Sequence, residues 1–285
     1  MKRFKTIAIL ATVSFLFPSL SSGFDLTLRL SSGLGWLKAD EVNRTLAGWR
    51  EGWKRQVEAY PNMSMEGESA ASLHLGIDFE AELLLSFSRW LALGIGAGYA
   101  FASLDEKQTL LPIRQDGVLF DYARPTKISA YPVFLSAYAF LPLGQKFNAY
   151  LRGGLGSMFA RCIVREVNKK AEAARFGYTV YDNARASRVG YLGGLGLSYA
   201  FDKSLGFFAE AEVRWAKVSG FEGEDDLGES GRLYTYDEYR PDIDFWQPRM
   251  ALHPEEPGGE GVRDVREATV DFSGYSVKIG LFLKL

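Results

Sequence analysis

Cysteine and histidine are scarce in this chain of 285 residues, which holds one cysteine and two histidines. A single cysteine, Cys162, cannot form an internal disulfide, so no disulfide framework supports the fold. His74 and His253 lie far from each other and from that cysteine, without the spacing of a zinc site. We therefore expect no metal site and no cofactor.

A large excess of one charge is also missing. The sequence has 33 Lys and Arg residues against 35 Asp and Glu residues, a formal net charge of −2. Interspersed charges of both signs are not typical of a nucleic-acid-binding protein, so we expect no nucleic-acid partner. Beyond residue 23, no run approaches the roughly 18 consecutive apolar residues of a transmembrane helix.

The first 23 residues have the three parts of a secretory signal peptide. A basic start precedes the apolar stretch 6–17, and small residues lead to an expected cleavage site before Phe24. An uncleaved N-terminal anchor is the alternative, and no cysteine follows the apolar stretch to carry a lipid. We predict a signal peptide at residues 1–23 and a single domain at residues 24–285.

Apolar residues alternate with small, polar or charged residues along much of the remaining chain. In 73–87 every odd position is apolar, and most even positions are small, polar or charged. A period of two indicates a strand with two unlike faces. The facing of the stretch 127–141 stays open, because its apolar residues occupy both parities. We predict eight strands, at residues 24–37, 72–87, 90–103, 127–141, 147–161, 188–202, 205–218 and 268–285.

The connections between these strands alternate between tight turns and long segments. Short turns at one end, long loops at the other and an even strand number are typical of outer-membrane barrels. The sequence therefore predicts an all-β fold, an eight-stranded antiparallel up-and-down transmembrane β-barrel with long extracellular loops and short periplasmic turns. The alternative is a soluble, lipocalin-like barrel with the apolar face inside.

Two observations favour an outward apolar face. Charges of both signs share the other face, which suits a wet or salt-bridged interior. Aromatic residues gather near the strand ends, as the interfacial girdles of a membrane barrel do. Those near the long connections are Trp36 and Trp215, and those near the tight turns are Trp90, Phe147, Tyr199, Phe201 and Phe207.

The charged residues of the inner face predict a salt-bridge network. The interior of an eight-stranded barrel is just wide enough for side chains, and buried charges persist when they are paired. Carboxylates two residues apart on a strand would also suit a glycosidase, but so narrow an interior leaves no room for a sugar chain. The predicted network consists of Arg29, Asp78, Glu80, Glu82, Arg152, Arg188, Glu210, Glu212, Arg214 and Lys278.

The stretch 91–102, "LALGIGAGYAFA", carries glycine at positions 94, 96 and 98. A dinucleotide-binding G-x-G-x-x-G turn lies between a strand and a helix, whereas here the third glycine comes one residue early and the strand continues. We interpret these glycines as an inner wall without side chains, which leaves room for arginines and glutamates from other strands.

Two long connections have features of their own. In 40–60 the apolar residues recur at helical spacing, with Asp40 as the expected N-cap and Pro61 as the stop. We expect this helix to pack on the outer rim of the barrel. A lid or plug, and a helix lying in the outer-leaflet interface, are the alternatives. The acidic segment 219–267 is expected to form a hairpin beyond the membrane, unless it re-enters to make ten strands.

A catalytic site has little support. Barrels that modify lipids, such as deacylases and palmitoyl transferases, need a histidine to take a proton from a serine hydroxyl. His74 and Ser72 share the polar face of one predicted strand, but such proximity is common. We therefore predict no catalytic residue and no enzymatic activity.

The chain closes on "KIGLFLKL", which resembles the C-terminal insertion signal of outer-membrane barrels. Lys278, Gly280, Leu283 and Leu285 fill its polar, glycine and two hydrophobic places, with leucine where a terminal phenylalanine is commonest. With "GGLGLSYAF", this end resembles the OmpW/OmpX-like small outer-membrane β-barrel proteins.

The resemblance implies an outer-membrane protein inserted by the barrel-assembly (Bam) machinery. We expect a monomer in the outer membrane of a Gram-negative-type bacterium, in contact with periplasmic chaperones during biogenesis and with the bilayer and lipopolysaccharide afterwards. The resemblance implies no particular activity. We expect a non-enzymatic protein with a structural or surface-interaction role through its long extracellular loops. The alternatives are a narrow channel or binding barrel for small hydrophobic molecules, and a lipid-A-modifying enzyme.

Overall fold

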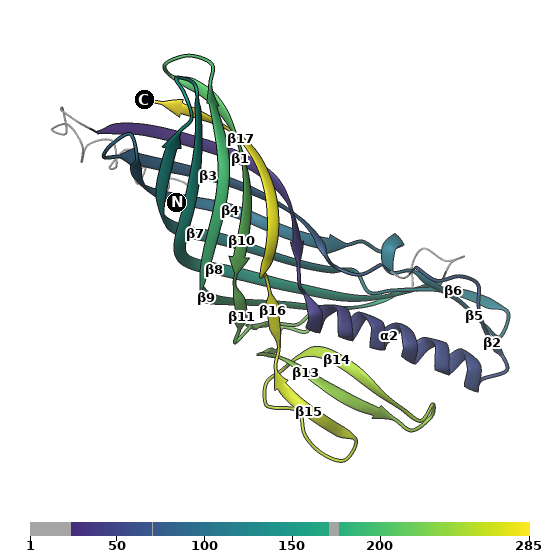
Figure 1. Ribbon diagram of the computed structural model, residues 1–285. Helices are drawn as coiled ribbons and strands as arrows, with labels where there is room; N and C mark the ends of the chain where they lie inside the picture. Colours follow the sequence, from purple (N-terminus) through teal and green to yellow (C-terminus); the bar gives the residue numbers. More distant parts are fainter. Residues whose placement is uncertain (1–23, 70, 171–176) are drawn as a thin grey trace, which may run out of the picture.

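The computed structural model describes residues 24–69, 71–170 and 177–285, so the predicted signal peptide lies outside the described residues. Eight strands form a closed antiparallel barrel (Figure 1). They are β1 (Asp25–Leu37), β3 (Leu75–Ser86), β4 (Leu91–Leu104), β7 (Thr126–Pro142), β8 (Phe147–Lys170), β9 (Gly177–Ala200), β10 (Leu205–Trp215) and β17 (Gly274–Lys284).

Each barrel strand pairs with the next along the chain, and β1 pairs with β17 to close the ring. Thr27 lies opposite Lys284 at one end of this last pairing, and Leu37 lies opposite Gly274 at the other. The predicted fold class is therefore confirmed. The ten-strand alternative is wrong, because the strands formed by the segment 219–267 lie outside the ring.

Large apolar side chains cover the outside of the barrel. Ile95 of β4 is 56% exposed, Leu135 of β7 is 61% exposed and Leu195 of β9 is 62% exposed. On β7 the odd positions from Tyr131 to Leu135 face outward and the even position Tyr138 faces inward, which settles the facing that the sequence left open. Predicted girdle residues at both ends of the barrel are exposed: Trp36, Trp215, Trp90, Phe147, Phe201 and Phe207.

The strand ends differ from the prediction on the side of the long connections. β8 and β9 continue past the predicted ends at 161 and 188, and stay paired as far as Lys169 and Gly177. The predicted strands 205–218 and 268–285 are each interrupted, and their detached ends form β11 (Lys217–Ser219) and β16 (Thr269–Asp271). β11 and β16 leave the ring because they pair with each other rather than with barrel strands.

The long connections fold into a cap, by which we mean residues 38–74, 105–125, 216–273 and the described parts of β8 and β9 beyond residues 161 and 186. Its helix is α2 (Asp40–Ala59), with the short η1 (Lys107–Thr109). Its strands, besides β11 and β16, are β2 (Met63–Met65), β5 (Leu111–Gln115), β6 (Val118–Ala123), β12 (Glu222–Glu224), β13 (Ser230–Arg240), β14 (Phe245–His253) and β15 (Val262–Glu267). β13 and β14 form the expected hairpin.

The helix predicted at 40–60 is confirmed, but its predicted cap is wrong. Asp40 is the first helical residue, and Ala39 is the N-cap in a left-handed conformation with φ of 42°. Ala39 takes this position because its N–H donates to the carbonyl of Asp271, which fixes the chain where it leaves the barrel. None of the described helices is long and apolar enough to cross a membrane.

The cap closes its end of the barrel with an apolar plug. The cap contributes Phe221, Leu233, Met250, Val270 and Phe272, all at most 1% exposed, together with Val42 and Leu46 of α2. The barrel wall contributes inward-facing Ile128 and Met158 to the same core, and Cys162 joins it from the part of β8 that belongs to the cap. The remainder of the apolar face of α2 packs on β2, β5 and β6. The helix thus lies on the rim, as expected, and its first turns also belong to a plug.

The glycines of β4 form a wall that is approached closely from inside the barrel. A Cβ on Gly94 would lie 2.5–2.9 Å from the Glu82 carboxyl group and from Leu84. A Cβ on Gly153 of β8 would meet nothing within 4 Å. The inner wall at Gly94 therefore has no space for a side chain.

We expect Gly94→Ala to destabilise the barrel by about 1–3 kcal/mol, because overpacking forces Glu82 or Leu84 to move. Gly153→Ala is the matched control and should leave the free energy of unfolding within about 0.5 kcal/mol. Urea unfolding in detergent, followed by heat-modifiable gel migration, measures both. Equal effects of the two substitutions would contradict the interpretation of the glycine wall.

Candidate functional site

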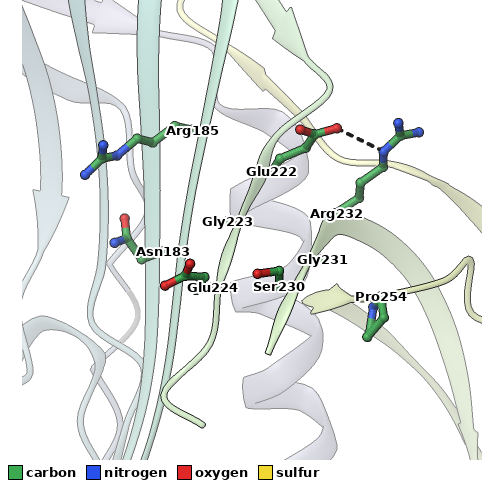
Figure 2. A pocket seen from close by; sticks show the side chains of 9 residues that line it. All are labelled: Asn183, Arg185, Glu222, Gly223, Glu224, Ser230, Gly231, Arg232 and Pro254. Carbon is green, nitrogen blue, oxygen red and sulfur yellow. Dashed lines mark hydrogen bonds and ion pairs between the residues drawn. The ribbon is translucent and has the colours of Figure 1, made fainter. Parts of the chain in front are cut away.

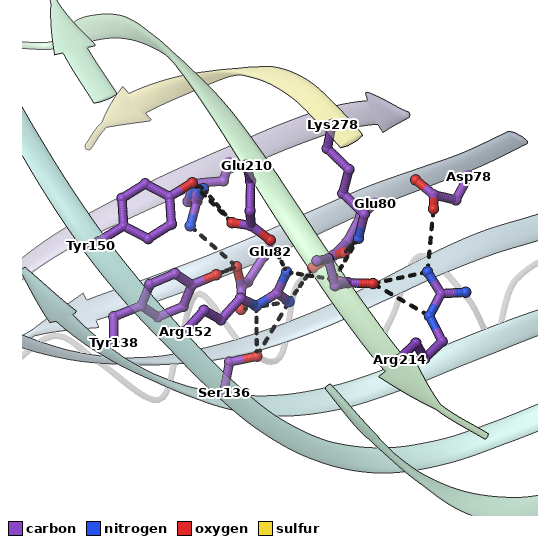
Figure 3. A network of polar contacts seen from close by, with 12 residues as sticks. Asp78, Glu80, Glu82, Ser136, Tyr138, Tyr150, Arg152, Glu210, Arg214 and Lys278 are labelled. Carbon is purple, nitrogen blue, oxygen red and sulfur yellow. Dashed lines mark hydrogen bonds and ion pairs between the residues drawn. The ribbon is translucent and has the colours of Figure 1, made fainter. Parts of the chain in front are cut away.

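The middle of the barrel is filled by charged side chains from strands on all sides (Figure 3). Four cations meet five carboxylates there, and none of these side chains is more than 9% exposed. The cations are Arg29 of β1, Arg152 of β8, Arg214 of β10 and Lys278 of β17. The carboxylates are Asp78, Glu80 and Glu82 of β3, and Glu210 and Glu212 of β10. We call these nine residues the lumen network.

Arg152 lies at the centre of the lumen network. Its guanidinium contacts four carboxylates, two from β3 and two from β10. The distances are 3.4 Å to Glu82, 3.0 Å to Glu210 and 3.4 Å to Glu212, with Glu80 as the fourth partner. Nε also donates to Ser136 Oγ. One side chain therefore links β8 to two other strands across the lumen.

Lys278 and Arg214 continue the network toward the cap. Lys278 Nζ donates to Glu80 at 2.8 Å and to Glu212 at 2.7 Å. Arg214 contacts Glu212 at 2.9 Å and Asp78 at 3.2 Å. Each of these cations has two carboxylate partners, so Coulomb attraction and hydrogen bonds offset the cost of removing the charges from water.

Aromatic side chains close the network on the side of the tight turns. Arg29 lies 3.2 Å from Glu210, and its guanidinium carbon is 3.7 Å from the centroid of the Phe208 ring. The Tyr150 hydroxyl accepts from Arg29 and donates to Glu210, while the Tyr138 hydroxyl donates to Glu82. These two hydroxyls supply donors to a set in which carboxylates outnumber cations by one.

The structure brings together nine of the ten residues predicted for the network and leaves Arg188 outside it. Arg188 is exposed, and its guanidinium donates to Ser219 Oγ at 3.5 Å. The reason is a change of partner along one edge of β9. Its residues from Tyr191 to Ala200 pair with β10, and its residues from Asn183 to Arg185 pair with β12. Arg188 lies in the notch between these two pairings, by which we mean residues 186–190 of β9, and its side chain reaches solvent there.

Sequence reasoning missed the two tyrosines of the network. The predicted network was chosen from charged residues alone, so Tyr138 and Tyr150 were not included in it, although Tyr150 shares the parity of Arg152. The even parity of Tyr138, which it shares with Ser136, was the available signal. The ambiguity of the stretch 127–141 hid that signal.

The pair of residues considered for catalysis is not assembled. His74 precedes β3 rather than lying on its inner face. Its ring stacks on Trp36 with centroids 4.7 Å apart, and Nδ1 lies 3.3 Å from the Leu37 carbonyl oxygen. Ser72 is exposed outside the strand. Among the described residues, no three His, Cys, Asp or Glu side chains are placed to hold a metal ion.

The four residues of the C-terminal motif have different surroundings. Lys278 belongs to the lumen network, and Gly280 lies against the Leu30 carbonyl and the Phe208 ring, where a Cβ would not fit. Leu283 and Leu285 are exposed at the open end of β17. Recognition of these residues by an assembly machinery stays a prediction.

The sequence placed Cys162 just beyond a predicted strand that ends at residue 161. In the structure β8 continues to Lys170, so Cys162 lies within the strand. It is 1% exposed in the apolar plug, and burial raises the pKa of its thiol to about 12. Asp182 faces the same end of the barrel, where burial raises the pKa of its carboxyl group to about 6. The charge of buried Arg124 acts in the opposite direction on that carboxyl group.

Comparison with known proteins finds no matching family model and no matching curated protein. Three solved structures are similar over most of their length. Neisserial surface protein A is 11% identical, with a TM-score of 0.35, and the match covers 93% of this chain and 98% of that one. The Yersinia pestis attachment invasion locus protein Ail, in complex with the heparin analogue sucrose octasulfate, is 8% identical, with a TM-score of 0.37 and coverages of 92% and 98%. The outer membrane protease OmpT of Escherichia coli is 8% identical, with a TM-score of 0.37 and coverages of 92% and 96%. Similarities this low transfer no function to this chain.

The geometry itself defines the class of barrel. A closed ring of antiparallel strands has an apolar outer surface between aromatic girdles and a charged interior. Short turns join the strands at one end and elaborate connections join them at the other. This is the architecture of an outer-membrane β-barrel.

We expect Arg152→Ala to destabilise the barrel by about 3–5 kcal/mol, because it leaves buried carboxylates without their central partner. Arg188→Ala removes the same side chain at the exposed notch and should change stability by less than about 0.5 kcal/mol. Thermal unfolding in detergent compares the two. An Arg152 variant as stable as the Arg188 variant would contradict the network as a stabilising element.

We also expect the Cys162 thiol to resist alkylation by N-ethylmaleimide at pH 8 in the folded barrel. The thiolate is the reactive form, and both burial and a pKa near 12 suppress it. Modification should become complete once urea unfolds the chain. Mass spectrometry of the intact protein measures it, and rapid labelling of the folded form would show that the plug opens.

Proposed function

We propose that this chain is a non-enzymatic outer-membrane barrel with a closed lumen, whose cap has a structural or surface-interaction role outside the cell. The observation that carries the proposal is the double closure of the barrel. The lumen network fills the middle of the interior, and the apolar plug fills the cap end. What the protein offers to its surroundings is then the folded cap.

The exposed apolar band supports a location in the outer membrane. Such an extensive apolar surface would promote aggregation in water, whereas a bilayer would cover it between the two aromatic girdles. Both described chain ends lie on the side of the tight turns, so both would be periplasmic, with the cap outside. Insertion by the Bam machinery, contact with lipopolysaccharide and a monomeric state belong to this proposal.

The finer resemblance to OmpW/OmpX-like proteins is also part of the proposal. It is supported by the C-terminal motif and by the strand pattern. The blocked middle and cap end of the interior argue against a channel, and the cavity left at the tight-turn end has charged lining residues such as Asp25, Arg29 and Lys284, which argues against a binding site for small hydrophobic molecules. The stacking of His74 on Trp36 argues against the lipid-A-modifying alternative, since it turns the imidazole toward an aromatic ring rather than toward Ser72.

We expect the purified barrel to give no reproducible single-channel steps in a planar lipid bilayer, because the lumen network and the apolar plug block the path through it. A known porin reconstituted in the same way serves as the positive control. Regular conductance steps from the folded, heat-modifiable form of this chain would overturn the closed lumen. Recovery of the chain in the soluble periplasmic fraction, rather than in the outer membrane, would overturn the location.

A further inference from the structure

Most exposed arginines of the cap have a carboxylate partner. Arg55 pairs with Glu51 at 3.0 Å, Arg114 pairs with Glu66 at 2.6 Å, and Arg266 pairs with Glu41 at 3.0 Å. The same holds for Arg44, Arg232, Arg240, Arg249 and Arg263. The charges of these eight arginines are thus paired within the surface of the cap.

Three neighbouring arginines at the base of the cap differ from these eight, and we call Arg161, Arg185 and Arg188 the arginine cluster. Among the described residues, none of the three has an ion pair. Arg161 Nε donates to the Asn183 amide oxygen at 2.7 Å, which orients the guanidinium and leaves its terminal nitrogens available. Arg188 has only its long hydrogen bond to Ser219.

The cluster brings like charges together. Arg161 and Arg185 are direct cross-strand partners on β8 and β9, an arrangement that is destabilising for like charges. On the other side of β9, Glu222 of β12 is the direct cross-strand partner of Arg185, but its carboxylate pairs with Arg232 at 3.2 Å. Figure 2 shows the Arg185 side chain directed away from this pair. Glu222 also lines the cavity of the cluster, but its carboxylate is engaged by Arg232, so the three guanidinium groups outnumber the one carboxylate there and form no ion pair with it.

The cluster lies at the upper edge of the apolar band. Phe159, two residues before Arg161, is 50% exposed, and its cross-strand partner Tyr131 is 55% exposed. All three arginines line one open cavity of about 750 Å³ together with Tyr131 and Phe159. A ligand in this cavity would contact guanidinium groups on one side and aromatic rings on the other.

We propose that the arginine cluster binds the phosphate groups of a glycolipid in the outer leaflet, the phosphorylated glucosamine headgroup of lipid A. Guanidinium groups bind phosphate through charge-assisted, often bidentate hydrogen bonds. The height of the cluster selects a lipid over a soluble anion, since acyl chains below the headgroup would lie along the apolar band. The inference rests on the proposed outer-membrane location.

The test uses the full folded chain in zwitterionic detergent and two probes with the same acyl chains, bis-phosphorylated lipid A and dephosphorylated lipid A. Retention of each probe on immobilised protein gives its affinity. We expect the phosphorylated form to bind at least about tenfold more tightly, and each single substitution Arg161→Gln, Arg185→Gln or Arg188→Gln to weaken binding by about tenfold. The control is the triple variant Arg55→Gln, Arg114→Gln, Arg266→Gln, which removes the same charge elsewhere on the cap.

Three results would overturn the inference. One is equal binding of the two lipid probes, and another is equal loss of binding in the control triple variant. The third is binding of inorganic phosphate or a sulfated oligosaccharide as tight as that of lipid A, which would assign the cluster to a soluble anion. Heat-modifiable migration of every variant shows that the barrel is folded. Failure of the outer-membrane location appears separately, in the fractionation of the cell envelope.

Discussion

The contact of one buried guanidinium with carboxylates from two strands underlies the organisation of this barrel. Arg152 reaches Glu80 and Glu82 on β3 and Glu210 and Glu212 on β10, so it connects parts of the wall that backbone hydrogen bonds do not join. Such a contact requires empty space in its path. The small residues of β4 and the glycines of β9 facing the lumen provide that space, and the tyrosines supply the remaining hydrogen-bond donors. The small residues of the strands and the charged network of the interior therefore depend on each other.

The barrel could be predicted from the sequence because its determinants are local. Alternation along each strand defines two faces, and the sequence order of the strands is also their order around the ring. Nine members of the lumen network followed from parity alone. Arg188 has the same parity and yet lies outside, because its position depends on where β9 changes its partner. No pattern within 188–202 carries that information.

The cap could not be predicted in the same way. Its core joins Val42 of the first long connection with Phe221, Leu233 and Phe272 of the last, two connections far apart in sequence. The helix at 40–59 was visible because it has its own period, but its N-cap was not, since Ala39 is held by the hydrogen bond that its N–H donates to a distant strand. Local periodicity thus described the wall and the helix. The plug depends on contacts between segments, which a single sequence does not show.

The notch in β9 also sets a physical boundary on the bilayer. Between Arg185 and Tyr191, β9 has no ladder partner on the side where β10 ends and β12 begins. Backbone amides without partners are very costly in hydrocarbon, which contains no water to satisfy them. In the proposed outer-membrane location, the hydrocarbon core would therefore end near the exposed ring of Tyr191 on this side of the molecule. The thickness of membrane that suits this barrel would then depend on a gap in its strand pairing as well as on the height of its apolar band.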